Sequence, residues 1–410
     1  MIGGLTRPDG SVPKRMSAQV IRQARFGDPG TAFEIEEVDV PAPQPTEVLI
    51  GVMAAGVNFN NVWAARGIPV DVIANRQRAG AVADFHIGGS DASGYVYAVG
   101  SAVSGMAVGD AVVVHPGSWD PDDAWVTSGR DPMLAPSARI WGYDTNYGAF
   151  AEFCVAQAHQ VLPKAPHLTW EESAAPTLVG ATAYRMLHGW KGNEVGPDDV
   201  VLVWGGAGGV GSQAIQLAKL AGARVVAVTS SAERTEYCIT LGADGCVDRR
   251  EFDHWGIPPH WTDVEGQRTW TDSARRFGKR IWGILGERRN PSLVIEHPGE
   301  ATVPTSIFAC ETGGMVVICA GTTGYSATVD LRYHWTRQKR LQGSHGANDE
   351  QAIAYNELVV AGKLDPCLGR VMQFSEVGKA HYEMGDGSAV AGNSVVLVGA
   401  PRPGLGREPG

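Results

Sequence analysis

The sequence predicts an α/β protein in which a doubly wound parallel sheet is inserted into a β-rich, barrel-like domain. Short apolar segments separated by turn residues recur over residues 18–160, which is typical of a β-rich unit. From Thr169 onward, strand-like and helix-like segments alternate, which indicates a parallel sheet covered by helices. After Leu364 the short strand pattern returns. We therefore expect a β-rich domain of residues 18–168 plus 365–400 and an inserted domain of residues 169–364.

The β-rich domain is expected to contain short strands bounded by Gly, Pro and Asp. These strands are predicted at residues 18–22, 34–40, 47–55, 94–99, 111–114, 149–155, 369–374 and 394–398. Two segments without clear periodicity, residues 68–85 and 117–139, are expected to be long loops. The two ends, residues 1–17 and 401–410, are rich in Gly and Pro, and we expect them to be flexible.

The inserted domain begins with a helix signal, because Thr169 followed by Glu172 forms a capping-box pattern. A second helix is expected over residues 181–190, and residues 250–290 are long enough to hold an inserted helical element. The strands of the predicted parallel sheet lie in the apolar run that begins at Val200 and at residues 223–229, 245–247, 292–296 and 314–319.

The most informative segment is the glycine-rich turn after the first of these strands. Gly206, Gly208 and Gly211 fit the pattern G-x-G-x-x-G between a buried strand and an amphipathic helix. The glycines allow a tight turn, a close approach of the backbone to a pyrophosphate, and close packing of helix on strand. The helix N-terminus then offers free N–H groups to phosphate. We therefore assign a dinucleotide site of the Rossmann type to Gly206, Gly208, Gly209, Val210 and Gly211.

The tip of the second strand indicates which dinucleotide binds. An NAD site usually has Asp or Glu there, but this chain has Ser230 and Ser231, followed by Arg234. Hydroxyl groups and a cation suit a 2′-phosphate, so we predict NADPH as the cofactor. The alternative is that Arg234 is a solvated helix residue and Glu233 is the acid, displaced along the chain.

The composition of the 410 residues excludes several classes of function. The net charge is −10 and the pI about 5.6, so nothing resembles the basic surface of a nucleic-acid-binding protein. No run of eighteen apolar residues and no signal peptide are found, so no membrane association is expected. The six Cys are scattered without a C-x-x-C pair, which favours buried thiols in a reducing compartment, the cytoplasm.

The domain order resembles that of the medium-chain dehydrogenase/reductase superfamily, which implies a GroES-like β-rich domain. Gly109-Asp110 and residues 148–152 match patterns that recur in its β-rich domain. More specific segments resemble the crotonyl-CoA carboxylase/reductase branch over roughly residues 40–400. They read VNFNNVW at 57–63, IWGYDTNYG at 140–148, LTWEE at 168–172, RFGKR at 276–280, EHPG at 296–299, RY at 332–333 and GSH at 343–345.

The zinc site of the related alcohol dehydrogenases is missing from this sequence. Their first Cys ligand falls on Asn58, and their Gly-His-Glu site reads Gly89-Ser90-Asp91. The lobe with four Cys that holds their structural zinc is also absent. Because zinc requires correctly spaced Cys and His ligands, we expect no bound metal.

The resemblance implies that NADPH delivers a hydride to Cβ of a 2-enoyl-CoA thioester. The resulting enolate is then either protonated or captures CO2. In the carboxylating enzymes an Asn, a Phe-Glu pair and a His hold CO2, and these positions fall on Asn60, Tyr143, Asp144 and His345. The Tyr hydroxyl can hold water, and water competes with CO2 for the enolate. The expected function is therefore reduction of a short-chain 2-enoyl-CoA, with reductive carboxylation as the alternative.

Each of these residues also has an ordinary structural interpretation. Asn60 could cap a turn, His345 could be a half-buried histidine at a strand end, and Asp144 could form an Asx-turn with the residues that follow it. Taken together within matching motifs, they favour a reaction site. An alternative of another class is a cofactor-binding protein that has lost its chemistry.

The resemblance also implies a site for the CoA moiety. Arg332 falls on an Arg that contacts CoA in the family, whereas Lys339 and Arg340 are expected on a solvated basic face. Thr312 stands where the carboxylating enzymes have a Lys near the CoA adenine. The expected partners are an acyl-CoA thioester, CO2 in the alternative reaction, and further copies of the chain in a homodimer or homotetramer.

Overall fold

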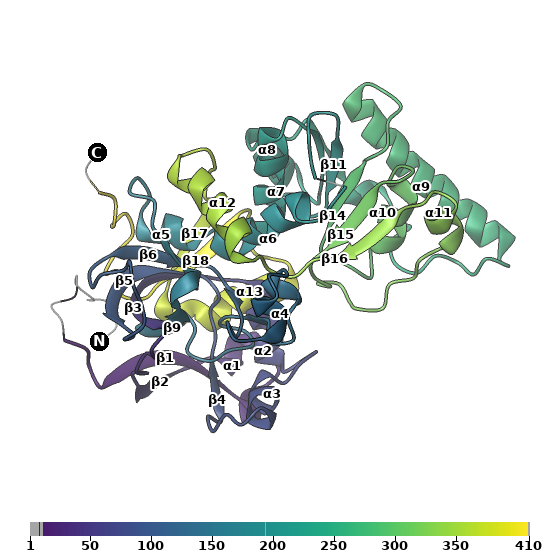
Figure 1. The fold of residues 1–410 in the computed structure, drawn as a ribbon. Helices are drawn as coiled ribbons and strands as arrows, with labels where there is room; N and C mark the ends of the chain where they lie inside the picture. The colour runs from purple at the N-terminus through teal and green to yellow at the C-terminus, as the bar shows by residue number, and fades with distance from the viewer. Residues whose placement is uncertain (1–7, 9–10, 193, 409–410) are drawn as a thin grey trace. The chain divides into compact units, whose positions relative to one another are not determined.

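The computed structural model describes residues 8, 11–192 and 194–408, which form two compact units (Figure 1). The first unit combines the described residues up to Ala181 with those from Gly346 onward, and the second unit is Thr182–His345. Residues 169–181 and 346–364, which the sequence analysis placed in the inserted domain, thus belong to the first unit. The reason is packing, because Ala181, Ala347 and Ala352 share a buried cluster with Val113 and Leu162 of the first unit.

The first unit is built around the long strand β3 (Glu47–Gly56), which is almost entirely buried. One edge of β3 pairs with β5, and the other edge is shared between β9 and β18. The main sheet has the order β10-β6-β5-β3-β18-β17, with β9 beside β3, and smaller sheets have the orders β2-β1-β4 and β7-β8. The other strands are β1 (Arg15–Arg22), β2 (Glu34–Asp39), β4 (Phe85–Ile87), β5 (Ala92–Val99), β6 (Ala111–Val114), β7 (Gly117–Ser118), β8 (Arg139–Ile140), β9 (Phe153–Gln157), β10 (Val161–Pro163), β17 (Leu368–Gln373) and β18 (Asn393–Leu397).

The second unit contains a parallel six-stranded sheet with the order β13-β12-β11-β14-β15-β16. Strand β11 (Val200–Val203) is wholly buried, as expected for a strand covered on both faces. Its residues Val200 and Leu202 pack with side chains of α9 and α10, while α7 packs on β11 and β12 (Figure 1). The other strands are β12 (Arg224–Thr229), β13 (Gly245–Asp248), β14 (Leu293–Glu296), β15 (Met315–Ile318) and β16 (Arg340–Gly343).

Helices surround both units. Those of the first unit are α1 (Pro29–Ala32), α2 (Phe59–Arg66), α3 (Val72–Arg78), α4 (Ala124–Thr127), α5 (Trp170–Ala174), α12 (Asp349–Val360) and α13 (Val377–Asp386). Helix α6 (Thr177–His188) runs across the division, and the second unit holds α7 (Gly209–Leu220), α8 (Ala232–Thr240), α9 (Val264–Leu285), α10 (Val303–Ala309) and α11 (Leu331–Trp335). Short 3-10 helices are η1 (Gln23–Arg25), η2 (Pro132–Leu134), η3 (Ala158–Gln160), η4 (Arg249–Glu251) and η5 (Phe374–Glu376).

The expected flexible ends differ from the structure. Strand β1 already begins at Arg15, and residues 1–7, 9–10 and 409–410 lie outside the described residues. Residues 401–408 are held by backbone hydrogen bonds: the Trp170 N–H donates to Leu405 O, and the Glu408 N–H donates to Pro166 O. Lys164 Nζ donates to Gly406 O at 2.8 Å. Composition alone did not reveal these bonds, because they are made by the backbone.

Three other local predictions also need correction. The segment 68–85 contains helix α3, whose N-terminus is capped by the Asp71 carboxylate through the N–H groups of Ile73 and Ala74. The segment 117–139 likewise contains β7, α4 and η2 rather than only loop. The strand expected at 149–155 is β9, which begins at Phe153 because the N–H groups of Ala149 and Phe150 instead bond to Gly89 O and Gly88 O.

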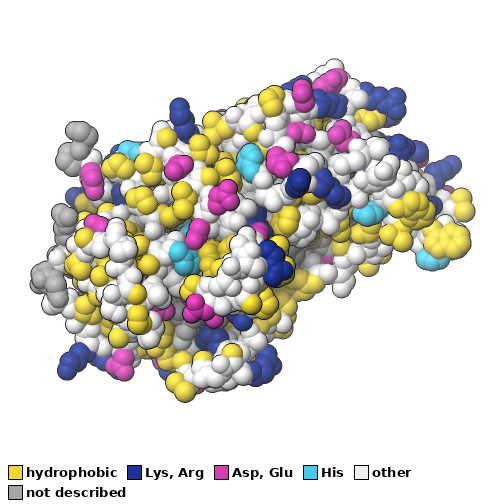
Figure 2. All heavy atoms as spheres, in the orientation of Figure 1, with side chains coloured by type: hydrophobic (Ala, Val, Ile, Leu, Met, Phe, Trp, Pro, Cys, Tyr) yellow, Lys and Arg dark blue, Asp and Glu magenta, His cyan; other side chains and the backbone are white. Residues whose placement is uncertain are grey.

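The surface carries charges of both signs. Figure 2 shows dark blue Lys and Arg side chains gathered over the part of the surface that carries α9. Within residues 11–192 and 194–408, no helix is long and apolar enough to cross a membrane. All six Cys are free thiols, and Cys154, Cys238, Cys310 and Cys367 are buried.

Candidate active site and cofactor turn

The glycine-rich turn lies between β11 and α7, where the sequence placed it. A Cβ on Gly211 would lie 2.4 Å from Gly205 O, and a Cβ on Gly206 would lie 2.7 Å from the Ala227 Cβ. Neither distance accommodates a side chain, so the helix can pack on the strand only through glycine. Gly208 is the N-cap of α7, and Gly208, Gly209 and Val210 are partly exposed at its N-terminus.

The strand order places this turn where a ligand is expected. From β11 the chain moves outward to β12 and β13 on one side, and then returns to β14 and β15 on the other. In open parallel sheets, ligands bind at the carboxyl ends of the strands at such a switch point. The crevice expected for a dinucleotide therefore lies at the ends of β11 and β14.

The second strand of this sheet ends in hydroxyl groups. Ser230 is exposed at the tip of β12, and Ser231 is the N-cap of α8, where its Oγ accepts from the Arg234 N–H at 3.2 Å. Arg234 is half-buried in the first turn of α8, whereas Glu233 is exposed. These positions fit a 2′-phosphate held by Ser230 and Arg234.

A buried carboxylate lies close to the glycine-rich turn. Glu296, at the end of β14, is fully buried, and its Oε2 accepts from Ser306 Oγ at 2.6 Å. Its Oε1 accepts from Thr302 Oγ1 at 2.6 Å and from the Gly299 N–H at 3.1 Å. Burial raises the pKa of Glu296 to about 7, although these hydrogen bonds oppose the shift.

This carboxylate is linked to the residue that precedes the glycines. The Trp204 Nε1–H donates to Ser306 Oγ at 2.7 Å, so the Ser306 hydroxyl proton is directed to Glu296. His297 Nε2 lies 3.0 Å from Trp204 O. Both side chains thus fix Trp204, which the glycine motif of the sequence did not reveal. The conspicuous EHPG segment, with a charged pair after an apolar strand, was the available signal.

In the first unit, Asn60 is part of a hydrogen-bond network of side-chain amide and hydroxyl groups. Asn60, in the first turn of α2, donates from Nδ2 to Ser90 Oγ at 2.8 Å. Its Oδ1 accepts from Asn61 Nδ2 at 2.9 Å, and Asn61 Oδ1 accepts from the Gly89 N–H at 3.3 Å. The Asn60 side chain therefore points across to the segment before β5 rather than capping its own helix.

Tyr143 and Asp144 lie together in the turn after β8. Asp144 Oδ2 accepts from the Ile140 N–H at 2.8 Å, so part of its role is local capping of that turn. Tyr143 is half-buried and packs against side chains of the core. Arg76 on α3 is largely buried, and desolvation lowers its pKa to about 10 although the charges of Asp144 and Asp71 oppose this shift.

His345 and Arg332 lie in the second unit. His345 is exposed and follows Ser344, whose N–H donates to Ile318 O at 2.8 Å. Arg332 on α11 is exposed and binds the Asp330 carboxylate at 2.5 Å and Gln267 Oε1 at 3.0 Å. The grouping of His345 with Asn60, Tyr143 and Asp144 in one reaction site stays a prediction.

A basic cavity of about 690 Å³ lies in the second unit between α9, the end of α10 and the segment after α11. Cations and aromatic rings line it together, and these are Arg275, Lys279, Trp282, Arg288, Phe308, Tyr333, Arg337 and Lys339. Lys339 is not on a solvated face as expected. It is buried and donates to Ile307 O at 2.6 Å, and burial lowers its pKa to about 8.

The residues at the zinc position of the related dehydrogenases do not fit a metal. Asn58 Nδ2 donates to Asp91 Oδ2 at 2.7 Å, and Asp91 Oδ1 accepts from the Leu178 N–H at 2.6 Å. Both oxygens of this fully buried carboxylate are thus occupied, and burial raises its pKa well above the usual range. No Cys or His donor is part of this arrangement.

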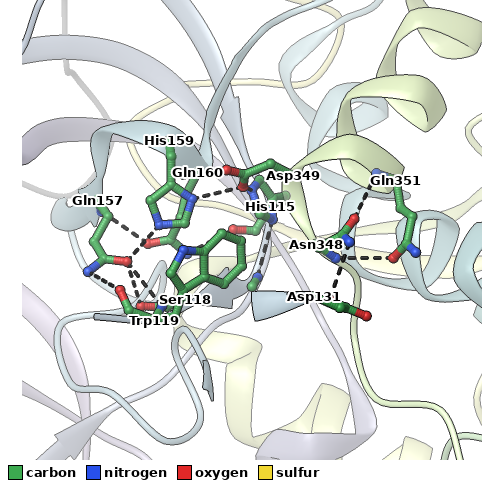
Figure 3. A network of polar contacts seen from close by, with 11 residues as sticks. His115, Ser118, Trp119, Asp131, Gln157, His159, Gln160, Asn348, Asp349 and Gln351 are labelled. Atoms are coloured by element: carbon green, nitrogen blue, oxygen red, sulfur yellow. Dashed lines mark hydrogen bonds and ion pairs between the residues drawn. The ribbon is translucent and has the colours of Figure 1, made fainter. Parts of the chain in front are cut away.

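One other group has a geometry compatible with a metal among the described residues (Figure 3): His115, His159 and Asp349. Asp349 Oδ1 lies 2.9 Å from His115 Nε2 and 2.8 Å from His159 Nδ1. The Gly117 N–H donates to His115 Nδ1 at 3.2 Å. Zinc at Nε2 would leave the ring proton on Nδ1, facing that donor, so His115 suits a proton on Nε2 better than a metal.

The hydrogen bonds of His159 fix the orientation of its ring. His159 Nε2 lies 2.7 Å from Gln157 Oε1, and the Gln157 amide is oriented by donation from its Nε2 to Trp119 O at 2.9 Å (Figure 3). Both ring nitrogens of His159 therefore face oxygen atoms, Asp349 Oδ1 on one side and Gln157 Oε1 on the other. Asp349, at the start of α12, is accordingly held by two imidazole rings.

Comparison with known proteins gives the same architecture. The alcohol dehydrogenase GroES-like domain family matches residues 44–166, and the zinc-binding dehydrogenase family matches residues 209–361. Although the name of the second family mentions zinc, Asn58 and Asp91 bind each other and do not form a set of zinc ligands.

Several known proteins, all of one enzyme family, are similar to this chain over nearly its whole length. The crotonyl-CoA carboxylase/reductase of Cereibacter sphaeroides is 48% identical, with 97% of this chain and 91% of that protein covered. The chain belongs to the crotonyl-CoA carboxylase/reductase family. The crotonyl-CoA reductase of Streptomyces collinus is 37% identical, with coverage of 94% and 86%.

Solved structures of the family extend this similarity to the fold. Crotonyl-CoA carboxylase/reductase AntE in complex with NADP has a TM-score of 0.94 and 51% identity, covering 98% of this chain and 99% of that one. The 2-octenoyl-CoA carboxylase reductase CinF with NADP and 2-octenoyl-CoA has a TM-score of 0.88 and 36% identity, covering 97% and 91%. The predicted family and the predicted fold class are confirmed.

Proposed function

We propose that this chain is an NADPH-dependent, zinc-independent reductase of short-chain 2-enoyl-CoA thioesters. The observation that carries the proposal is the similarity over almost the full length to an enzyme solved with NADP, at 51% identity. The glycine turn and the absence of an acid at the tip of β12 support the same cofactor. In this reaction NADPH supplies the hydride that is added to Cβ of the substrate.

The residues of the second unit bind and orient the cofactor. Gly206, Gly208, Gly209, Val210 and Gly211 leave the N-terminus of α7 open to the pyrophosphate. Ser230, Ser231 and Arg234 receive the 2′-phosphate, which an acidic side chain would repel. The contact of His297 with Trp204 O, and the link from Glu296 through Ser306 to the Trp204 indole, hold the turn in one conformation.

Residues of the first unit, together with His345, bind and protonate the enolate. We place Asn60, Tyr143, Asp144 and His345 around the reacting carbons. Asn60 is oriented by Ser90, so its amide has a fixed direction, and the Asp144 carboxylate is fixed by the Ile140 N–H. The Tyr143 hydroxyl can hold a proton donor close to Cα, and protonation there completes the reduction.

Reductive carboxylation is the second candidate, favoured by the names of the similar proteins. In that reaction Cα of the enolate attacks CO2 and forms a new C–C bond, and no proton is added. Asn60 and His345 match the residue types expected for this reaction, while Tyr143 and Asp144 depart from them. An aromatic ring without a hydroxyl would exclude water more completely, so these two positions decide between the outcomes.

The CoA moiety needs cations for its phosphates. We place it along the basic cavity of the second unit, where Lys279, Arg288 and Arg337 offer positive charge beside the Tyr333 ring. Arg332 lies next to Tyr333 and would reach substrate after exchanging its contact with Asp330.

We also propose that the protein is a homodimer or homotetramer, which light scattering would test. We further propose a reducing cytoplasmic location, which suits six free thiols.

The test is product analysis with crotonyl-CoA and NADPH, with and without ¹³C-bicarbonate. We expect NADPH consumption, a saturated acyl-CoA as the main product, and unchanged activity in the presence of a chelator. A Tyr143→Phe/Asp144→Glu double variant should raise the carboxylated fraction by about tenfold, or roughly 1–2 kcal/mol in the partition. Incorporation of one label per NADPH in the wild type would establish carboxylation instead, and absence of NADPH consumption would contradict both reactions.

A further inference from the structure

His297 lies at the switch point of the parallel sheet, beside the glycine turn. It directly follows β14, whose neighbour β11 leads into the turn. A Cβ on Gly205 would lie only 2.5 Å from His297 Nε2, and Gly205 has a φ of +54°. The imidazole ring therefore packs directly against the backbone that is expected to cradle the pyrophosphate.

The hydrogen bonds of His297 determine its tautomer. Its Nε2 lies 3.0 Å from Trp204 O, and a carbonyl can only accept, so Nε2 carries the proton. Burial lowers the pKa of His297 to about 4, although the bond to Trp204 opposes the shift, so the ring is neutral at physiological pH. Nδ1 consequently presents a lone pair.

This lone pair has no hydrogen-bond partner within the part of the chain that the structure describes. It is also not enclosed. Buried side-chain nitrogens without partners occur in His86, His254 and His381, but Nδ1 of His297 is not one of them, and the residue is partly exposed. An acceptor that is open at the switch point suits a ligand that brings a donor.

The order of the cofactor along the sheet identifies that donor. The 2′-phosphate end belongs at the tip of β12, where Ser230 lies, and the pyrophosphate belongs at the turn after β11. The half beyond the pyrophosphate therefore extends over β14. Because the His297 ring touches the turn itself, the nearest group is the ribose that carries the nicotinamide, whose hydroxyls are donors.

We propose that His297 is a cofactor-binding residue whose Nδ1 accepts a hydrogen bond from a hydroxyl of the nicotinamide ribose. The proposal rests on NADPH being the cofactor. The bond to Trp204 and the close contact with Gly205 hold the ring in place, so the acceptor is oriented before the cofactor binds.

Two substitutions separate this role from a purely structural one. In His297→Asn, the amide oxygen can take the place of Nδ1, while the bond to Trp204 is lost. In His297→Gln, the amide nitrogen can still reach Trp204 O, but no acceptor remains at the Nδ1 position. His260→Gln, in the exposed segment before α9, is the matched control.

The measurement is the Kd of each protein for three ligands, by calorimetry, with melting temperature to establish folding. The ligands are NADPH, 2′-phospho-ADP-ribose, which keeps the ribose but lacks nicotinamide, and adenosine 2′,5′-bisphosphate, which lacks both. We expect His297→Gln to weaken NADPH and 2′-phospho-ADP-ribose about tenfold, as for one lost hydrogen bond, and His297→Asn to weaken them less than about threefold. Binding of the bisphosphate should be unchanged.

The opposite ranking of the two variants, or an equal loss for all three ligands, would show that His297 acts only through Trp204 and would overturn the proposal. A loss for NADPH that spares 2′-phospho-ADP-ribose would overturn the assignment to the ribose. If wild-type protein binds NADPH and His297→Gln binds it equally well, only the role of His297 fails. If wild-type protein does not bind NADPH, the proposed function fails as well.

Discussion

The carboxylates of Asp349 and Glu296 lie in different units and have opposite pKa shifts. Burial raises the pKa of both, but hydrogen bonds and charge from His115 and His159 bring that of Asp349 below its usual value. Glu296 receives bonds from neutral Ser306 and Thr302 hydroxyls, and its pKa rises to about 7. The comparison teaches that hydroxyl donors satisfy the geometry of a buried carboxylate without compensating for its lost hydration, whereas two imidazole donors, which also attract its charge, do both.

The two carboxylates also differ in what they hold. Asp349 connects the N-terminus of α12 to β6 and η3 through two imidazoles (Figure 3). Glu296 connects the end of β14 to α10 and, through Ser306, to Trp204 before the glycine turn. A defect at Asp349 should therefore affect the first unit, and a defect at Glu296 should affect cofactor binding by the second.

The largest effect is expected for Glu296→Ala. It leaves the Ser306 and Thr302 hydroxyls and the Gly299 N–H without their acceptor in a fully buried site, and it creates a cavity. The unfolding free energy should fall by about 3–5 kcal/mol. Thermal unfolding followed by calorimetry measures this, with exposed Glu287→Ala as the control. A change no larger than that of the control would show that the network is unimportant for stability.

A pH series with Glu296→Gln sharpens the comparison. The folded pKa of about 7 lies above the usual 4.5, so the contribution of Glu296 to stability is present below 4.5 and is lost as the pH rises through 7. The melting temperature of the variant should therefore rise relative to wild type between pH 5 and pH 8. The corresponding free-energy change is at most about 3 kcal/mol. A constant difference over this range would contradict a raised pKa.

Asp349→Asn should have a smaller effect at neutral pH. The variant loses the carboxylate charge, but its amide oxygen can still accept one imidazole proton. Since the Asp349 side chain is about a third exposed, solvent screening limits the loss to about 1–2 kcal/mol. Chemical denaturation measures the loss; the Trp119 ring, whose centroid lies 4.3 Å from that of His159, is beside this contact.

The smallest effect on stability is expected for Asp349→Asn at acidic pH. The folded pKa of Asp349 lies below 3.8, so its contribution is present above 3.8 and is lost as the pH falls through the folded value. The deficit of Asp349→Asn should be constant between pH 5 and pH 7 and should shrink below pH 4, by less than about 1 kcal/mol. A deficit that already shrinks at pH 6 would indicate that titration of a histidine governs this contact.

Local patterns predicted most strands and the cofactor turn, because each depends on neighbouring residues. The apolar run at residues 111–114 is β6, and Thr169 and Glu172 form the predicted capping box. The polar networks were not predictable in this way. Asp349 meets His115 across 234 residues, and Trp204 meets Ser306 across 102, so only the folded chain brings them together.

The predicted reaction residues illustrate the same distinction. Asn60, Tyr143 and Asp144 were found through segments that resemble a family, since their types alone also fit ordinary turns. The structure adds what the sequence could not contain: Ser90 orients Asn60, and Arg76 places a buried cation within electrostatic reach of Asp144. Ser90 is 30 residues away from Asn60 along the chain, and Arg76 is further still from Asp144.

The segment 401–408 is recognised by the first unit mainly through its backbone, and this limits how evolution can change it. Trp170, Lys164 and Pro166 contact main-chain atoms, so most side chains in the segment are free to drift without loss of docking. A few positions are constrained. Gly406 has a φ of +96°, and a Cβ there would lie 2.7 Å from the Trp170 ring. Leu405 packs against the core of the first unit and Arg407 binds the Glu172 carboxylate at 2.9 Å, so divergence is restricted around Gly406 and tolerated more freely before it.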